Sequence, residues 1–164
     1  MPKEKRPEIV VGGEAYLRIP IKTHILTPKD DPLEVVRTYA LPVLQPGDIL
    51  FIAETPLAIM QNRHRHIDTI RVSFWAKLLS RFVTKSPYGV GVRSPRAMQV
   101  AIEEVGLARI LLATLASAWG KFVLRRRGDF YRVAGLAVKA IDAEHTMGIK
   151  EFYDYVIPGP VRCD

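Results

Sequence analysis

The chain has 164 residues, of which 48% are hydrophobic, which is enough for one packed domain but too little for two full ones. Its 24 Lys and Arg against 17 Asp and Glu give a formal net charge of +7, which favours anionic partners such as nucleotides, acidic metabolites or nucleic acid. The single cysteine, Cys163, excludes an internal disulfide framework and indicates a reducing compartment.

The N-terminal residues are charged and contain proline, with no apolar run behind them, so no secretory signal is expected. The longest apolar stretch, 110–120, is shorter than the roughly 20 residues that a membrane-spanning helix needs. We therefore expect a cytoplasmic protein without a membrane partner.

The residue pattern in the first third of the chain predicts strands and one helix. We expect residues 1–13 to be flexible and residues 14–26 to form an edge strand, or two short strands separated at Pro20. Asp31 is a candidate N-cap for a helix that begins at Pro32.

The apolar run 49–53 follows a Pro-Gly-Asp turn and predicts a strand that is covered on both faces. A short helix or an irregular crossover with a basic end follows it. His64 and His66 lie in that basic end, and their spacing of two allows a metal clamp, although a solvated basic turn is the favoured interpretation. 

The middle of the chain has helical periodicity. The pattern predicts an amphipathic helix over 72–83. It also predicts a helix from about Pro95 to Val105, stopped by Gly106, and a central core helix over 107–122. The two tryptophans, Trp75 and Trp119, are expected in the core.

After residue 129 the pattern changes to short β-branched runs, which predict two or three strands. The fold class expected is α+β, with a mixed or antiparallel sheet, strands near both ends and a central group of helices. We expect a single domain over 1–164, and allow that it is the N-terminal part of a longer architecture.

Four segments together resemble the coenzyme F-420:γ-glutamyl ligase family, especially its short bacterial ligase-like members. They are "THILTPKDDPLEVV", "LQPGDILFIAET", "GVGVRSPRAMQVAIEEVGLARILLA" and "GDFYRVAGLAVKAID". The resemblance extends from about Ile21 to Pro160. It implies an acid–amino-acid ligase that joins L-glutamate to a deazaflavin coenzyme through a γ-linked amide, with GTP and Mg²⁺ or Mn²⁺.

The resemblance also implies positions for the site. The nucleotide-binding positions that it implies are Thr23, His24, Ile25, Leu26, Glu54 and Thr55. It assigns a metal-ligand position to Asp142, in "VKAID", and matches Arg63 to an arginine of the family.

The chain departs from the family pattern at two places. Ile59 stands where the family has a lysine, and isoleucine cannot supply that residue's charge to a phosphate. The later "D…GRPWR" signature, which supplies a second metal ligand, has no counterpart. The alternative to a ligase is therefore a non-catalytic binding domain that keeps the fold.

A further set of residues is marked by charge or by backbone freedom. The candidates for binding an anion or substrate are Arg63, Gly89, Gly91, Arg93, Ser94, Arg96 and Arg132. Ser94 ahead of Pro95 is also an ordinary helix start, and that structural role is favoured. Arg132, in a predicted apolar strand, needs either an anionic ligand or a carboxylate partner, and both remain open.

No catalytic nucleophile is assigned, because nothing in the sequence places a Ser or Cys beside a His. The expected partner is a small anionic molecule such as a nucleotide or an acidic metabolite. The sequence allows a homodimer, and without a base-stacking motif nucleic acid is not expected.

Overall fold

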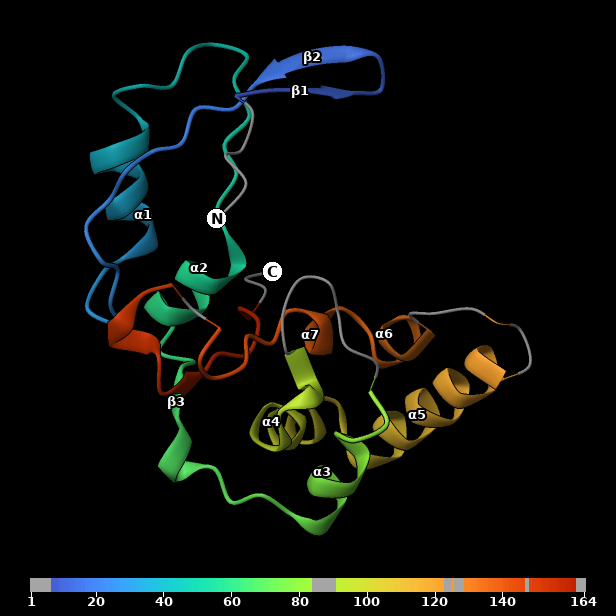
Figure 1. Ribbon diagram of the computed structural model, residues 1–164. Coiled ribbons are helices and arrows are strands. Elements are labelled where there is room, and N and C mark those ends of the chain that lie inside the picture. The colour runs from blue at the N-terminus through green and yellow to red at the C-terminus, as the bar shows by residue number, and fades with distance from the viewer. Residues whose placement is uncertain (1–6, 84–90, 123–124, 126–128, 147, 162–164) are drawn as a thin grey trace.

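The computed structural model describes residues 7–83, 91–122, 125, 129–146 and 148–161. They form helices and two small antiparallel sheets, so the α+β fold class is confirmed. Along the chain, strands come near both ends and the larger helices come between them, as the colours of Figure 1 show.

The first sheet is a hairpin of β1 (Glu8–Val11) and β2 (Glu14–Leu17). Gly12 and Gly13 connect the strands with φ of +62° and +92°, the conformation of the tight turns that match strand twist. A strand thus occupies part of the first 13 residues, where no element was expected.

The next helix begins as predicted. The Asp31 side chain accepts a hydrogen bond from the backbone N–H of Leu33 and caps α1 (Pro32–Val35). The chain continues directly into one turn of π-helix, η1 (Val36–Ala40).

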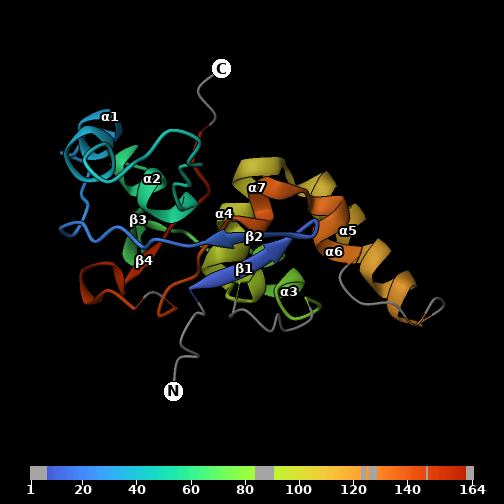
Figure 2. The ribbon, with the colours of Figure 1, turned by 90° about the horizontal axis from the view of Figure 1, so that it is seen from above.

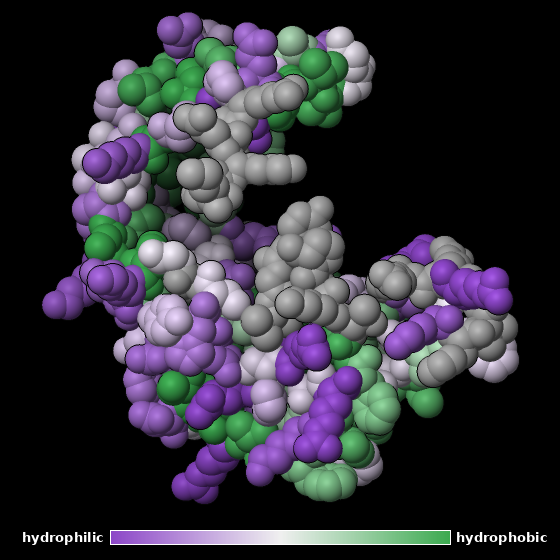
Figure 3. Space-filling view, viewed as in Figure 1, coloured by the Kyte–Doolittle hydropathy of each residue, from purple (hydrophilic) through white to green (hydrophobic). Residues whose placement is uncertain are grey.

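The predicted strand over 49–53 is wrong. The structure assigns no strand there, and Phe51 is 86% exposed. Apolar composition favours a buried strand only if a neighbouring strand can pair with it, and no strand in the described ranges does so. Exposed apolar residues are visible in green on the face shown in Figure 3.

The elements in the middle of the chain are short. They are α2 (Glu54–Met60), β3 (Arg65–His66), the 3-10 turn η2 (Ile67–Thr69), α3 (Phe74–Leu79) and the 3-10 turn η3 (Gly91–Arg93). The helix predicted over 72–83 is therefore present but shorter, and the strand predicted over 14–26 covers only β2.

Two long helices match the sequence patterns. The Ser94 side chain caps α4 (Pro95–Val105), which ends at Gly106 with φ of +84°. The following helix α5 covers Leu107–Phe122. Capping residues and 3.6-residue periodicity are local signals, and here both gave the correct boundaries.

The segment after residue 129 differs from the prediction. Helices α6 (Asp129–Ala134) and α7 (Leu136–Lys139) replace the first expected strand, and Gly135 separates them with φ of +94°. Short apolar runs do not distinguish a strand from a buried helix. The last elements are the 3-10 turn η4 (Lys150–Phe152) and β4 (Tyr155–Val156).

The main core lies between α3, α4, α5, α6 and α7. Its buried side chains include Met98, Ile110, Phe130 and Val138. The tryptophans are not part of it, because Trp75 is 43% and Trp119 64% exposed. The burial of each helix is decided by its neighbours, which periodicity alone does not show.

A smaller cluster joins α2 to the C-terminal segment. Ala58 and Ile59 pack there with Phe152 and Ile157. Strand β4 pairs with β3 beside this cluster, and in Figure 2 α2, β3 and β4 lie together, away from α5 and α6. No helix in the described ranges has the length and hydropathy to cross a membrane.

Candidate functional site

The candidate site is centred on two residues that the sequence implicated separately. Thr55 lies in the first turn of α2, and Asp142 forms an antiparallel bridge with Ile157 through two backbone hydrogen bonds of 2.9 and 3.0 Å. The Thr55 hydroxyl donates a short hydrogen bond to Oδ2 of Asp142. Both side chains are half-buried, so the fold fixes their positions.

Asp142 alone does not fit the metal site that the resemblance implies. Mg²⁺ and Mn²⁺ prefer several oxygen ligands, and one Asp142 oxygen already accepts from Thr55. No group of three or more His, Cys, Asp or Glu side chains able to hold a metal exists among the residues described. The two histidines of the basic turn do not change this result.

The carboxylate of Glu144 lies at the N-terminus of α4, where an anionic ligand was considered. Oε1 of Glu144 accepts a 2.5 Å hydrogen bond from the hydroxyl of Ser94, and the guanidinium of Arg96 lies 3.7 Å from it. The Ser94 oxygen also accepts from the backbone N–H groups of Arg96 and Ala97. A carboxylate is stabilised there by the positive end of the helix dipole.

Glu144 is the residue that sequence reasoning missed. It is only 9% exposed, and its second oxygen, Oε2, is buried without a hydrogen-bond partner in the described part of the chain. The segment 142–144 therefore places one carboxylate against α2 and another against α4. Two acidic residues two positions apart were the available signal, but nothing local showed that both would be enclosed.

The glycine and the arginine ahead of Ser94 have different roles. Gly91 has φ of +52°, and a Cβ built on it would lie 2.8 Å from the hydroxyl of Tyr131. A turn and a close approach therefore account for this glycine. Arg93 is exposed, whereas Gly89 lies outside the described residues.

His24 belongs to a separate polar network. Its ring nitrogens contact the Tyr39 hydroxyl at 2.8 Å and the Asp30 carboxylate at 2.9 Å. Hydrogen bonds from the backbone N–H and hydroxyl of Thr27, together with His24, lower the pKa of Asp30. This network fixes the loop ahead of α1.

The remaining implied nucleotide positions are neighbours in sequence of His24 or of Thr55. The Thr23 hydroxyl donates to the backbone carbonyl of His24 at 2.8 Å, Ile25 is exposed and Leu26 is half-buried. Glu54 is exposed in the first turn of α2. Among the described residues, no hydrogen bond connects 23–26 with Thr55.

The basic turn is attached to α4 and is not simply solvated. Arg63 lies 2.5 Å from Glu104, with 20% of its side chain exposed, and Arg65 forms an ion pair with Glu103. His64 lies between these arginines with its Nδ1 buried and unpartnered among described residues. Burial lowers the pKa of His64.

Arg132 does not lie in a strand. It belongs to α6, its side chain is 68% exposed, and it lies 3.5 Å from Asp129 one turn earlier. The helical spacing places this carboxylate beside it. Of the two readings left open by the sequence, the structure shows the carboxylate partner.

Ile59, at the position of the family lysine, faces the interior. It is 3% exposed and packs in the cluster with Phe152 and Ile157. The Ile59 side chain therefore helps to pack α2 against the C-terminal segment and is not available to a phosphate.

A family model described as F420-0:Gamma-glutamyl ligase matches residues 20–128, more than half of the chain. The matched range includes Thr55 and the start of α4 but ends before Asp142 and Glu144. Neither the search of curated proteins nor that of solved structures gave a match.

Proposed function

The chain belongs to the F420-0:gamma-glutamyl ligase family, and from this premise we propose that it joins the carboxyl group of an acidic metabolite to the amino group of an amino acid. GTP is the nucleotide that the family resemblance implies. In such a reaction a carboxylate oxygen attacks the γ-phosphorus of GTP, an acyl phosphate forms, and GDP is the leaving group. The amine then attacks the acyl carbon, releases phosphate and loses a proton.

The single observation that carries this proposal is the hydrogen bond between Thr55 and Asp142. It joins two positions, 87 residues apart in the chain, that the family resemblance marks for nucleotide binding and for a metal ligand. Oδ1 of Asp142 makes no hydrogen bond with a described residue, so it can accept from the ammonium group of an amino acid. We assign Asp142 this binding role.

The described residues do not provide a complete metal site, so no step of the proposed reaction depends on a metal held by protein side chains alone. The proposed contributions of this chain are binding and orientation. Holding an amine next to an activated carboxyl group accounts for much of the rate of such reactions.

The test supplies GTP, L-glutamate and F420-0 to the purified protein, with and without Mn²⁺, and measures the mass of the product together with GDP release. We expect a product heavier by one glutamyl residue, and its loss in Asp142→Asn. The exposed carboxylate Glu151 provides the matched control, because Glu151→Gln should leave turnover unchanged.

The buried Ile59 and the incomplete metal site favour a second candidate, a binding domain without turnover. In that case GTP or an acidic metabolite raises the melting temperature but no glutamylated product forms. If neither ligand changes the melting temperature and no product forms, both candidates are wrong.

A further inference from the structure

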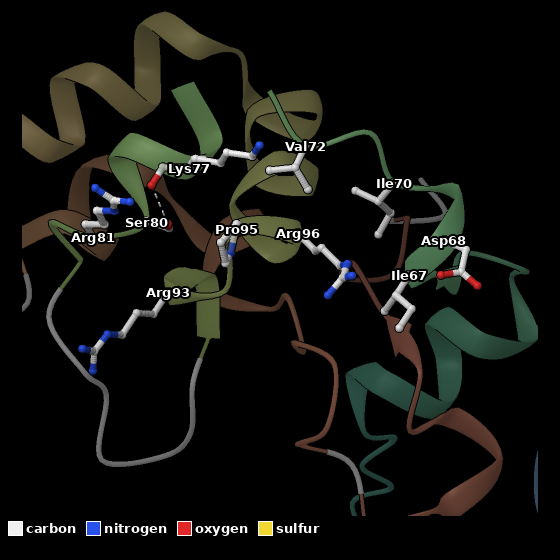
Figure 4. A pocket seen from close by; sticks show the side chains of 10 residues that line it. All are labelled: Ile67, Asp68, Ile70, Val72, Lys77, Ser80, Arg81, Arg93, Pro95 and Arg96. Atoms are coloured by element: carbon white, nitrogen blue, oxygen red, sulfur yellow. Dashed lines mark hydrogen bonds between the residues drawn. The ribbon is translucent and has the colours of Figure 1, made fainter. Parts of the chain in front are cut away.

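A cavity of about 810 Å³ opens between the segment 67–72, helix α3 and the start of α4 (Figure 4). Sites for small organic molecules have volumes of roughly 300 to 1,000 Å³. The cavity includes neither Thr55 nor Asp142 in its lining, so it is a separate site from the one described above.

Positive side chains dominate the lining. Lys77 comes from α3, Arg81 from the turn just after this helix, Arg93 from η3 and Arg96 from the first turn of α4. Asp68 is the one acidic lining residue described. The side chain of Asp68 is 80% exposed and lies 3.4 Å from His66. These four cations create a positive potential that attracts anions.

Most of these cations are free to bind a ligand. Lys77, Arg81 and Arg93 form no ion pair within the described ranges, whereas Arg96 forms an ion pair of 3.7 Å with the buried Glu144. The arginines of the basic turn are different, because Arg63 and Arg65 are paired with glutamates of α4. Unpaired guanidinium groups around a cavity are suited to bidentate binding of phosphate.

The arrangement of the cations indicates how the charge of a ligand is distributed. In Figure 4, Arg81 and Arg93 lie on one side of Pro95, and the guanidinium of Arg96 lies on the other. Aliphatic side chains, Ile67 and Ile70 among them, line the wall beyond Arg96. Cations on two sides of the cavity favour a ligand whose negative charge is divided between two groups.

We propose that this cavity, the basic pocket, binds a small molecule that carries two or more phosphate groups, with inorganic pyrophosphate as its simplest probe. Arg81 and Arg93 hold one phosphate group, and Arg96 holds the other. The inference goes beyond the proposed ligase function, because it depends only on residues outside the Thr55–Asp142 pair and holds whether or not the chain has turnover.

The test is isothermal titration of the intact protein with pyrophosphate at constant ionic strength. We expect the double variant Arg81→Gln/Arg93→Gln to weaken binding about tenfold or more, since two charge-assisted contacts are lost. Arg71→Gln is the matched control, because Arg71 is exposed in the same 67–72 segment but does not line the cavity. It should change the dissociation constant by less than about twofold.

Equal weakening by Arg71→Gln and by the double variant would show a diffuse positive surface and overturn the proposal, as would the absence of pyrophosphate binding. Inorganic phosphate should bind at least about tenfold more weakly than pyrophosphate, because it reaches one group of cations only. Thr55→Val should leave pyrophosphate binding unchanged, so a failure of the ligase proposal is distinguished from a failure of this one.

Discussion

The hydroxyl of Thr55 donates a hydrogen bond to the carboxylate of Asp142 and thereby fastens the first turn of α2 to the C-terminal segment. Thr55→Val keeps the shape of the side chain and removes the donor. A half-buried acceptor without its donor should lower the free energy of unfolding by about 1 kcal/mol, measured in urea. Thr55→Ser retains the hydroxyl and should remain close to wild type. If valine and serine behave alike, this bond has no part in stability.

Because Ser94 contacts the carboxylate of Glu144, we expect an aspartate cap to destabilise the protein at this helix start. Asp is normally as good an N-cap as Ser, but Ser94→Asp would place a second carboxylate against the buried one of Glu144. We expect a loss of about 2 kcal/mol or more in urea unfolding. In a Glu144→Gln background the same change should cost much less. An equal cost in both backgrounds would contradict the assigned contact.

Gly91 is constrained by its backbone and by its neighbour. Gly91→Ala should destabilise the protein by at least about 1 kcal/mol, because φ is +52° and the new methyl group would lie against the Tyr131 hydroxyl. In a Tyr131→Phe background only the backbone strain remains, so the cost of the alanine should be smaller. Gly148→Ala, where a Cβ meets nothing within 4 Å, is the control for thermal unfolding.

His64 should make stability depend on pH. Burial lowers its pKa in the folded state, so below the unfolded-state value of about 6.5 the unfolded chain binds a proton that the folded chain does not. The free energy of unfolding contributed by this residue therefore falls as the pH decreases from 7 toward 5. His64→Leu should flatten that slope in urea unfolding at each pH.

An exposed histidine gives the comparison for this slope. His145 has φ of +62°, a conformation that asparagine tolerates, so His145→Asn removes an exposed imidazole with little strain. We expect this variant to keep the slope that His64→Leu removes. A slope that is lost in His145→Asn and kept in His64→Leu would contradict the role of His64.

The buried position of Ile59 can be tested directly. Ile59→Lys restores the residue type of the family pattern, but at a site that is 3% exposed it should cost about 3 kcal/mol or more. Ile59→Leu, which keeps the volume and the apolar character, should cost about 1 kcal/mol. A stable Ile59→Lys variant with increased GTP affinity would show that the side chain reaches the nucleotide.

Local signals in the sequence predicted the parts of the fold that have local causes. Asp31, Ser94 and Gly106 fix the ends of helices through their own backbone and side-chain hydrogen bonds, and all three were identified correctly. The exposed run 49–53 and the helices α6 and α7 were misassigned, because their states depend on which neighbours are present. Apolar composition alone does not contain that information.

In the candidate site, too, the sequence indicated the local features but not the contacts between distant residues. Thr55 and Asp142 were named from a resemblance, but their contact follows from the bridge between Asp142 and Ile157, which is a long-range pairing. Glu144 was not assigned to the site, since its burial depends on α4, fifty residues earlier in the chain. Arg96 was identified by its place at a helix start, which is a local feature.

The segment 142–144 also has a consequence for synthesis of the protein. Helices α2 and α4 leave the ribosome well before the two carboxylates that contact Thr55 and Ser94. Until residues 142–157 have emerged, the partners of both helix starts are missing, and the candidate site is assembled only when the backbone bridge between Asp142 and Ile157 closes. A nascent chain therefore carries the residues of both helix starts before it carries the two carboxylates that complete the site.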